Sequence, residues 1–239
     1  MLTQEAFRFM ADLGENNNKA WFDENRKRYE QYVRQPMKSL AEALDDPVSL
    51  IMPEFSGKAK VSRINNDIRF SPNKPPYKSH YWISFGAKEG ACANLFAGID
   101  KNGWVCGAGI GDAKREPLNI WRENLLDYQK KWRKFTTALG MDPQKQVFTE
   151  NSYKKPLYPD IPDDLFPIVQ AKGVWIIDQN RQEFERSYVE DVFRGLCKFL
   201  PVYLLMTVPK KDLKGRMNEL GKKIIAPDAE IDKLWKIMQ

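Results

Sequence analysis

Apolar residues in the first part of the chain recur every three or four positions, which is the spacing of one helix face. Gly14 ends the first of these runs, and the triplet Asn16–Asn18 offers a cap for the second. The pattern predicts three helices, over residues 3–13, 19–34 and 36–44. Pro47 is expected to end the last one, because proline breaks the hydrogen-bond ladder of a helix interior.

The pattern changes after Pro53, where short apolar or alternating runs are separated by turn residues. Asp100–Gly103 contains Asn-Gly, whose tolerance of positive φ favours a tight hairpin. Pairing through such turns predicts an antiparallel sheet of about four or more strands within residues 60–110. The expected strands are 60–70, 81–86, 92–99 and 104–110.

Helical spacing returns in the second half of the chain, over about 117–139 and 179–200, with an expected edge strand at 174–177. N-terminal and C-terminal helices around an antiparallel sheet make an α+β fold. We expect one such domain over residues 1–206, followed by a basic, partly helical extension over 207–239.

Charge is concentrated in two places, although the net charge of +6 over 239 residues is modest. Residues 58–78 hold six Lys or Arg against one acid, and residues 210–223 hold six against two. These windows carry more than the whole net charge, so the rest of the chain is slightly acidic. A basic surface indicates an anionic partner.

Composition excludes several classes of protein. A mean hydropathy of −0.58 and the lack of a long apolar run argue against a membrane protein, and the N-terminus lacks a secretion signal. The three cysteines, Cys92, Cys106 and Cys197, are widely spaced and suggest buried thiols in a reducing, cytoplasmic compartment. With a single histidine in the chain, we expect no metal site, and nothing indicates a cofactor.

The stretch 63–80 is the strongest candidate for a site. It combines four cations with one acid and three prolines. Guanidinium groups match oxyanions in a fixed fork, and a rigid backbone lowers the ordering cost of binding. The predicted ligand-binding residues are Arg63, Arg69, Lys74, Tyr77 and Lys78.

Two further residues of this stretch are candidates for acid–base chemistry. His80 is the only side chain whose ordinary pKa lies near neutrality, and Asp67 is placed to orient the arginines. A structural interpretation stands beside each functional one. Asp67 between two arginines is typical of a network that pins a loop, a lysine-rich turn is often only solvated, and a lone histidine is often structural. Whether the protein is an enzyme stays open.

Three groups of residues carry a family resemblance. They are Asn17–Phe22 with Arg26 and Tyr29, the block Arg63–His80, and Gly107–Gly109 followed by Pro117 and Arg122. Together they resemble the domain-of-unknown-function family 2461 over roughly residues 3–206. Asn66 and Asn73 stand where the family pattern has Arg and Asp, which is either a neutral exchange of a charged pair or a weakened site. The resemblance implies no reaction.

The leading hypothesis is a protein that binds a phosphate- or carboxylate-bearing small molecule through residues 63–80. The alternative is a nucleic-acid-binding module that uses the basic segments 58–78 and 210–223, with Tyr77, Tyr81 and Trp82 stacking on bases. A protein-interaction scaffold without a ligand is the third possibility.

Overall fold

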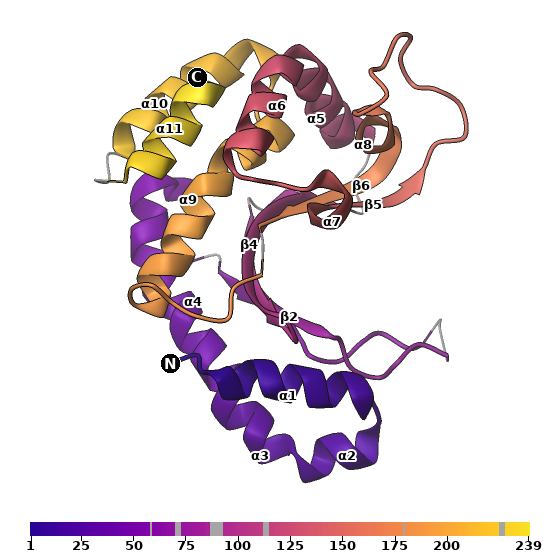
Figure 1. Ribbon diagram of the computed structural model, residues 1–239, viewed down its shortest axis with the longest axis vertical. Helices are drawn as coiled ribbons and strands as arrows, with labels where there is room; N and C mark the ends of the chain where they lie inside the picture. Colours follow the sequence, from indigo (N-terminus) through magenta and orange to yellow (C-terminus); the bar gives the residue numbers. More distant parts are fainter. Residues whose placement is uncertain (58, 70–72, 87–92, 112–114, 179, 225–227) are drawn as a thin grey trace. The chain divides into compact units, whose positions relative to one another are not determined.

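The computed structural model describes residues 1–57, 59–69, 73–86, 93–111, 115–178, 180–224 and 228–239 (Figure 1). Lys58 and Cys92 lie outside these ranges, so the structure does not test the expectations that involve them. No helix within the described ranges combines the length and the apolar content needed to cross a membrane.

A six-stranded antiparallel sheet forms the centre of the described fold, in the order β1-β2-β3-β4-β6-β5. The strands are β1 Lys60–Val61, β2 His80–Phe85, β3 Ala93–Asp100, β4 Gly103–Ile110, β5 Val147–Ser152 and β6 Ala171–Ile177. The predicted α+β class and the antiparallel pairing are confirmed.

Two details of the strand prediction are wrong. β6 pairs with β4 on one side and with β5 on the other, so it is an interior strand and not an edge. The first strand is limited to Lys60–Val61. Beyond it, Asn66 donates through its side chain to the carbonyl oxygens of Pro75 and Tyr77, so the chain folds back as a long loop.

The chain divides into two compact units, and β3, β4 and the helix α9 Tyr188–Thr207 contribute residues to both. The first unit comprises Met1–Phe85, Phe96–Val105 and Asn180–Phe193. The second comprises Gly86–Leu95, Cys106–Gln179 and Arg194–Gln239. The predicted boundaries at 1–206 and 207–239 stay a prediction.

Apart from the first turns of α9, the helices of the first unit precede its strands in the sequence. They are α1 Gln4–Glu15, α2 Lys19–Glu24, α3 Arg26–Arg28, the π-helical turn η1 Tyr29–Arg34, α4 Gln35–Ile51 and the 3₁₀ turn η2 Pro53–Phe55. α4 continues through Pro47, contrary to the prediction. Val48 and Ile51 extend its buried apolar face, and their packing outweighs the hydrogen bond that proline removes.

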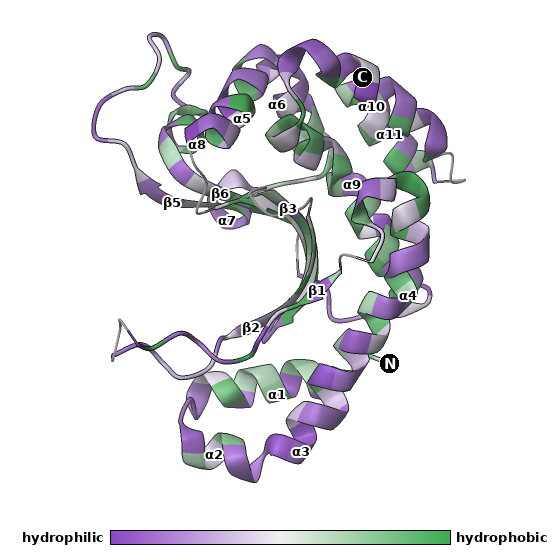
Figure 2. Ribbon diagram, turned by 180° about the vertical axis from the view of Figure 1, so that it is seen from behind, coloured by the Kyte–Doolittle hydropathy of each residue, from purple (hydrophilic) through white to green (hydrophobic). Residues whose placement is uncertain are grey.

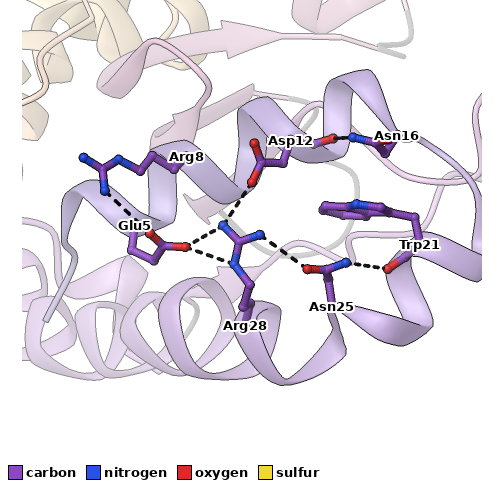
Figure 3. A network of polar contacts seen from close by, with 7 residues as sticks. All are labelled: Glu5, Arg8, Asp12, Asn16, Trp21, Asn25 and Arg28. Atoms are coloured by element: carbon purple, nitrogen blue, oxygen red, sulfur yellow. Dashed lines mark hydrogen bonds and ion pairs between the residues drawn. The ribbon is translucent and has the colours of Figure 1, made fainter.

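A network of polar contacts fixes α3 against α1 (Figure 3). The Arg28 guanidinium donates to Glu5 Oε1 at 3.0 Å and to Asn25 Oδ1 at 3.3 Å, and it pairs with Asp12 Oδ2 at 3.0 Å. The same group lies 5.7 Å from the centre of the Phe9 ring. The helix that continues from α3 is therefore anchored at its start.

The second unit surrounds β5 and β6 with helices. They are α5 Arg115–Asp127, α6 Gln129–Ala138, α7 Pro143–Gln146, α8 Phe166–Gln170, the larger part of α9, α10 Lys210–Lys223 and α11 Ala229–Met238. Figure 2 shows α9 as largely hydrophobic and α10 as mixed, in keeping with the buried residues of α9 and the lysines of α10. Asp228 caps α11 by accepting from the backbone N–H groups of Glu230 and Ile231.

Candidate functional site

A cleft of about 430 Å³ opens in the first unit. One wall is a helical face that runs from Phe22 to Lys38, and the opposite wall is the extended segment 61–65. Tyr77 and Tyr81 complete the lining. The extended segment is held in place because Ser62 N donates to the Trp82 carbonyl oxygen at 2.7 Å.

Cations dominate the polar lining of this cleft. Arg26, Arg34, Lys38 and Arg63 line it, against the single carboxylate of Glu30. Lys38 and Arg63 have no ion-pair partner among the described residues, and both are exposed. Guanidinium and ammonium groups donate charge-assisted hydrogen bonds, which are stronger than those between neutral groups.

The other two cations are paired with acids three or four residues before them in the sequence. Arg34 Nη1 contacts both carboxylate oxygens of Glu30, at 2.8 and 2.9 Å, and these contacts raise the pKa of Arg34. Arg26 Nη2 donates to Asp23 Oδ1 at 2.6 Å, which raises the pKa of Arg26. Both guanidiniums are therefore fixed in direction while keeping free N–H groups.

Five of the cleft residues on the helical wall are spaced by four: Phe22, Arg26, Glu30, Arg34 and Lys38. Tyr29 lines the cleft beside them. In an α-helix each step of four overshoots a full turn by about 40°. The π-helical turn Tyr29–Arg34 holds more residues per turn and so works against this drift. It therefore reduces the drift between Glu30 and Arg34, the two members of the series that it contains.

Two buried hydroxyl groups meet at the cleft. Tyr29 Oη donates to Tyr81 Oη at 3.2 Å, and the two residues are only 5% and 3% exposed. Burial is the main cause that raises the pKa of Tyr29. One hydrogen bond uses one of their two protons. The other proton has no acceptor among the described residues and is available to a ligand.

The backbone of Tyr77 is clamped by asparagines. Asn17 accepts from Tyr77 N at 3.0 Å and donates to the Tyr77 carbonyl oxygen at 2.9 Å, while Asn66 donates to the same oxygen at 3.0 Å. The Tyr77 ring then stacks on Phe22, with centroids 4.1 Å apart. Asn18 is the helix cap, since it accepts from Trp21 N. The role of Asn17 as a clamp was not foreseen.

Of the residues predicted as ligand-binding, Arg63 and Tyr77 line the cleft. Arg69 instead pairs with Asp67 at 2.7 Å, and both are exposed. This contact lowers the pKa of Asp67 and raises that of Arg69. The pair does not line the cleft. Among the described residues Asp67 has an ion pair with Arg69 and none with Arg63.

The lysines of the block also lie away from the cleft lining. Lys74 is exposed, and Lys78 is half-buried. Burial lowers the pKa of Lys78, and the charges of Lys74 and Arg63 add to the effect. The three cations are thus close enough to repel one another, which leaves a positive field beside the cleft.

His80 packs against Trp82, with ring centroids 4.9 Å apart. Trp82 in turn lies on Gly98, where an added Cβ would fall 1.6 Å from Trp82 Cε3. Because side chains alternate along β2, His80 points to the face opposite Tyr81. Burial and the charge of Lys78 lower its pKa. His80 is therefore a neutral group outside the cleft.

Sequence reasoning missed Arg26, Arg34 and Lys38 as candidates for the site. All three lie on predicted helices, where a basic residue is usually part of a solvated face. The signal that could have found them is the repeated spacing of four among residues 22–38.

No group of three or more His, Cys, Asp or Glu side chains that could hold a metal ion occurs in the described ranges. Comparison with curated proteins and with solved structures gave no match. A family model described as "Conserved hypothetical protein (DUF2461)" matches residues 5–199, which is most of the chain. The chain therefore belongs to the DUF2461 family.

Proposed function

We propose that the protein binds a small molecule bearing a phosphate or carboxylate group in the cleft of its first unit. The observation that carries the proposal is the lining itself, with four cations against one carboxylate around about 430 Å³. Lys38 and Arg63 supply charges that no acid in the described residues neutralises. A bound oxyanion would accept from these groups in charge-assisted hydrogen bonds.

The tyrosine hydroxyls support the same proposal. A buried O–H without an acceptor is unfavourable, and a ligand oxygen would relieve that cost. The Tyr29–Tyr81 pair holds one such proton at the cleft. Tyr77, held by Asn17 and Asn66, adds a further ring to the lining.

The proposal is recognition rather than turnover. Asp67 and His80, the residues for which the sequence suggested acid–base chemistry, do not line this cleft. The cytoplasm is part of the proposal, because the buried thiol of Cys197, which forms no disulfide with the described residues, suits a reducing compartment.

The nucleic-acid alternative has less support from the described residues. In the basic segment 210–223, Lys210 pairs with Asp127 at 2.7 Å. Arg216 and Lys223 both pair with Glu219 at 2.9 Å. Half of the cations of that segment are therefore matched by acids. This alternative predicts oligonucleotide binding that weakens steeply with salt.

Thermal shift with pyrophosphate tests the proposal, using two charge-matched double variants. Lys38→Gln with Arg63→Gln removes two cations of the cleft, and Lys74→Gln with Lys78→Gln removes two cations outside it. The expected result is stabilisation of wild type and of the second variant by pyrophosphate, with little effect on the first. Equal responses of the two variants would mean non-specific attraction, and the cleft would not be the site.

A further inference from the structure

The cations of the cleft are spread along a helix, and this arrangement bears on the shape of the ligand. Arg26 and Arg34 are eight residues apart, which corresponds to about 12 Å along the axis at the α-helical rise and to somewhat less where the π-helical turn Tyr29–Arg34 holds more residues per turn. Lys38 lies one turn further on. A single phosphate group is much too small to contact both arginine positions unless their side chains converge.

The ion pairs prevent that convergence. Arg26 is held by Asp23, three residues before it, at 2.6 Å. Arg34 is held by Glu30, four residues before it, at 2.8 Å. Both guanidiniums are thus drawn in the same direction along the helix. The two guanidinium groups are therefore about as far apart as the backbone positions of Arg26 and Arg34.

Each end of the helical wall also has its own hydroxyl group. At one end, Tyr77 stacks on Phe22 with ring centroids 4.1 Å apart, and the Phe22 ring lies 5.3 Å from the Arg26 guanidinium. At the other end, Tyr29 belongs to the same π-helical turn as Arg34, and its partner Tyr81 lines the cleft with it. The cleft thus has two donor groups, one centred on Arg26 and one on Arg34.

We infer that the cleft takes an elongated ligand with two oxyanion groups roughly 10 Å apart, one bound by Arg26 and Tyr77 and the other by Arg34, Lys38 and the tyrosine pair. This inference rests on the proposed function and narrows its ligand to a class of α,ω-dianions. Arg63, on the facing segment, contributes charge to the space between the two ends.

Calorimetry with a series of alkane α,ω-bisphosphates tests the inference, with the matched alkyl monophosphates as controls. The spacer is lengthened one methylene at a time. The bisphosphate of best length should bind one per chain, roughly 10-fold or more tighter than its monophosphate, because the second contact is intramolecular. The monophosphate should bind at two places per chain.

The variants Arg26→Gln and Arg34→Gln each remove one end. In either variant, the best bisphosphate should bind with about the affinity of the monophosphate. Each variant should bind one monophosphate per chain. If bisphosphates and monophosphates bind with equal affinity at every spacer length, the inference of a ligand with two oxyanion groups is wrong. The proposed function, binding of an anion in the cleft, would still stand. Failure of both series to bind would overturn the anion site and the inference together.

Discussion

Asn17 and Tyr77 exchange two hydrogen bonds across 60 residues of sequence, with the Asn17 side chain meeting both backbone groups of Tyr77. The side-chain amide supplies both the donor and the acceptor that the contact needs. The exchange joins the start of α2 to the loop that follows β1. It therefore sets the positions of Phe22 and Tyr77, which stack beside the cleft.

Replacing Asn17 by Asp should destabilise the protein, because a carboxylate can accept from Tyr77 N but faces the Tyr77 carbonyl oxygen without a proton to donate. We expect a loss of about 1–3 kcal/mol in the free energy of unfolding. Urea denaturation measures it. The control is Asn73→Asp, on an exposed residue of the block 63–80 that contains Tyr77. The free energy of unfolding of this variant should be close to that of wild type. Equal stability of the two variants would show that the Asn17 clamp is unimportant.

Removing the Tyr81 hydroxyl should weaken ligand binding more than it weakens the fold. Tyr81→Phe leaves the buried ring in place and takes away one member of the hydroxyl pair. A hydrogen bond to a charged group contributes about 1.5–3 kcal/mol, so pyrophosphate affinity should fall roughly 10-fold or more. Calorimetry gives the affinity and urea denaturation the stability. Unchanged affinity would mean that the free proton does not face the ligand.

His80 should make the stability depend on pH near neutrality. Its pKa in the folded protein lies below the ordinary 6.5 because of burial and the charge of Lys78, partly offset by Asp100. The unfolded chain therefore binds the proton more readily than the folded one. Stability is full above about pH 6.5 and is lost as pH falls through the lower folded pKa.

The chain has one histidine, so His80→Gln isolates this effect. The urea midpoint of wild type should fall between about pH 7 and about pH 5, and the midpoint of the variant should fall less. Parallel curves for the two proteins would contradict the lowered pKa.

Arg122 should be essential for the stability of the second unit. It is only 1% exposed and donates to the carbonyl oxygens of Val169 at 2.8 Å and Ala171 at 2.6 Å, where α8 passes into β6. Burial lowers its pKa, and the Tyr153 ring lies 5.2 Å from the guanidinium. Arg122→Met leaves both carbonyl oxygens without this donor and should cost roughly 2–4 kcal/mol.

Urea denaturation tests this, with Arg115→Met on the exposed side of the same helix as the control. Arg122→Lys should recover only part of the loss, because one ammonium group lacks the planar fork that reaches two acceptors. An Arg122→Met variant as stable as its control would contradict the structural role.

The fold was largely predictable from the sequence, because its signals are local. Asn102–Gly103 and the alternating apolar runs on either side indicated the β3–β4 hairpin, which is present. The edge assignment of residues 174–177 failed because only pairing distant in sequence, with β4 and β5, decides which strand is interior. The predicted helix end at Pro47 is wrong because the buried position of Ile51 stabilises the last turn of α4, and the local sequence pattern does not reveal that burial.

The candidate site was harder to predict than the fold. The block 63–80 was identified as basic, and two of its residues, Arg63 and Tyr77, line the cleft. The helical wall that faces them comes from residues 22–38, and nothing local indicates that these two segments meet. Because side chains alternate along β2, His80 lies on the sheet face opposite Tyr81. This depends on the register of the strand, which composition alone does not predict.

Isothermal titration of pyrophosphate into Arg63→Ala and Arg69→Ala tests the central claim most directly. The two arginines are six residues apart in one basic block, but Arg63 lines the cleft and Arg69 is exposed and paired with Asp67. Both variants lose the same charge. The account predicts that Arg63→Ala weakens binding about 10-fold or more, as expected for a lost charge-assisted hydrogen bond, while Arg69→Ala binds like wild type. Equal affinities of the two variants would contradict it.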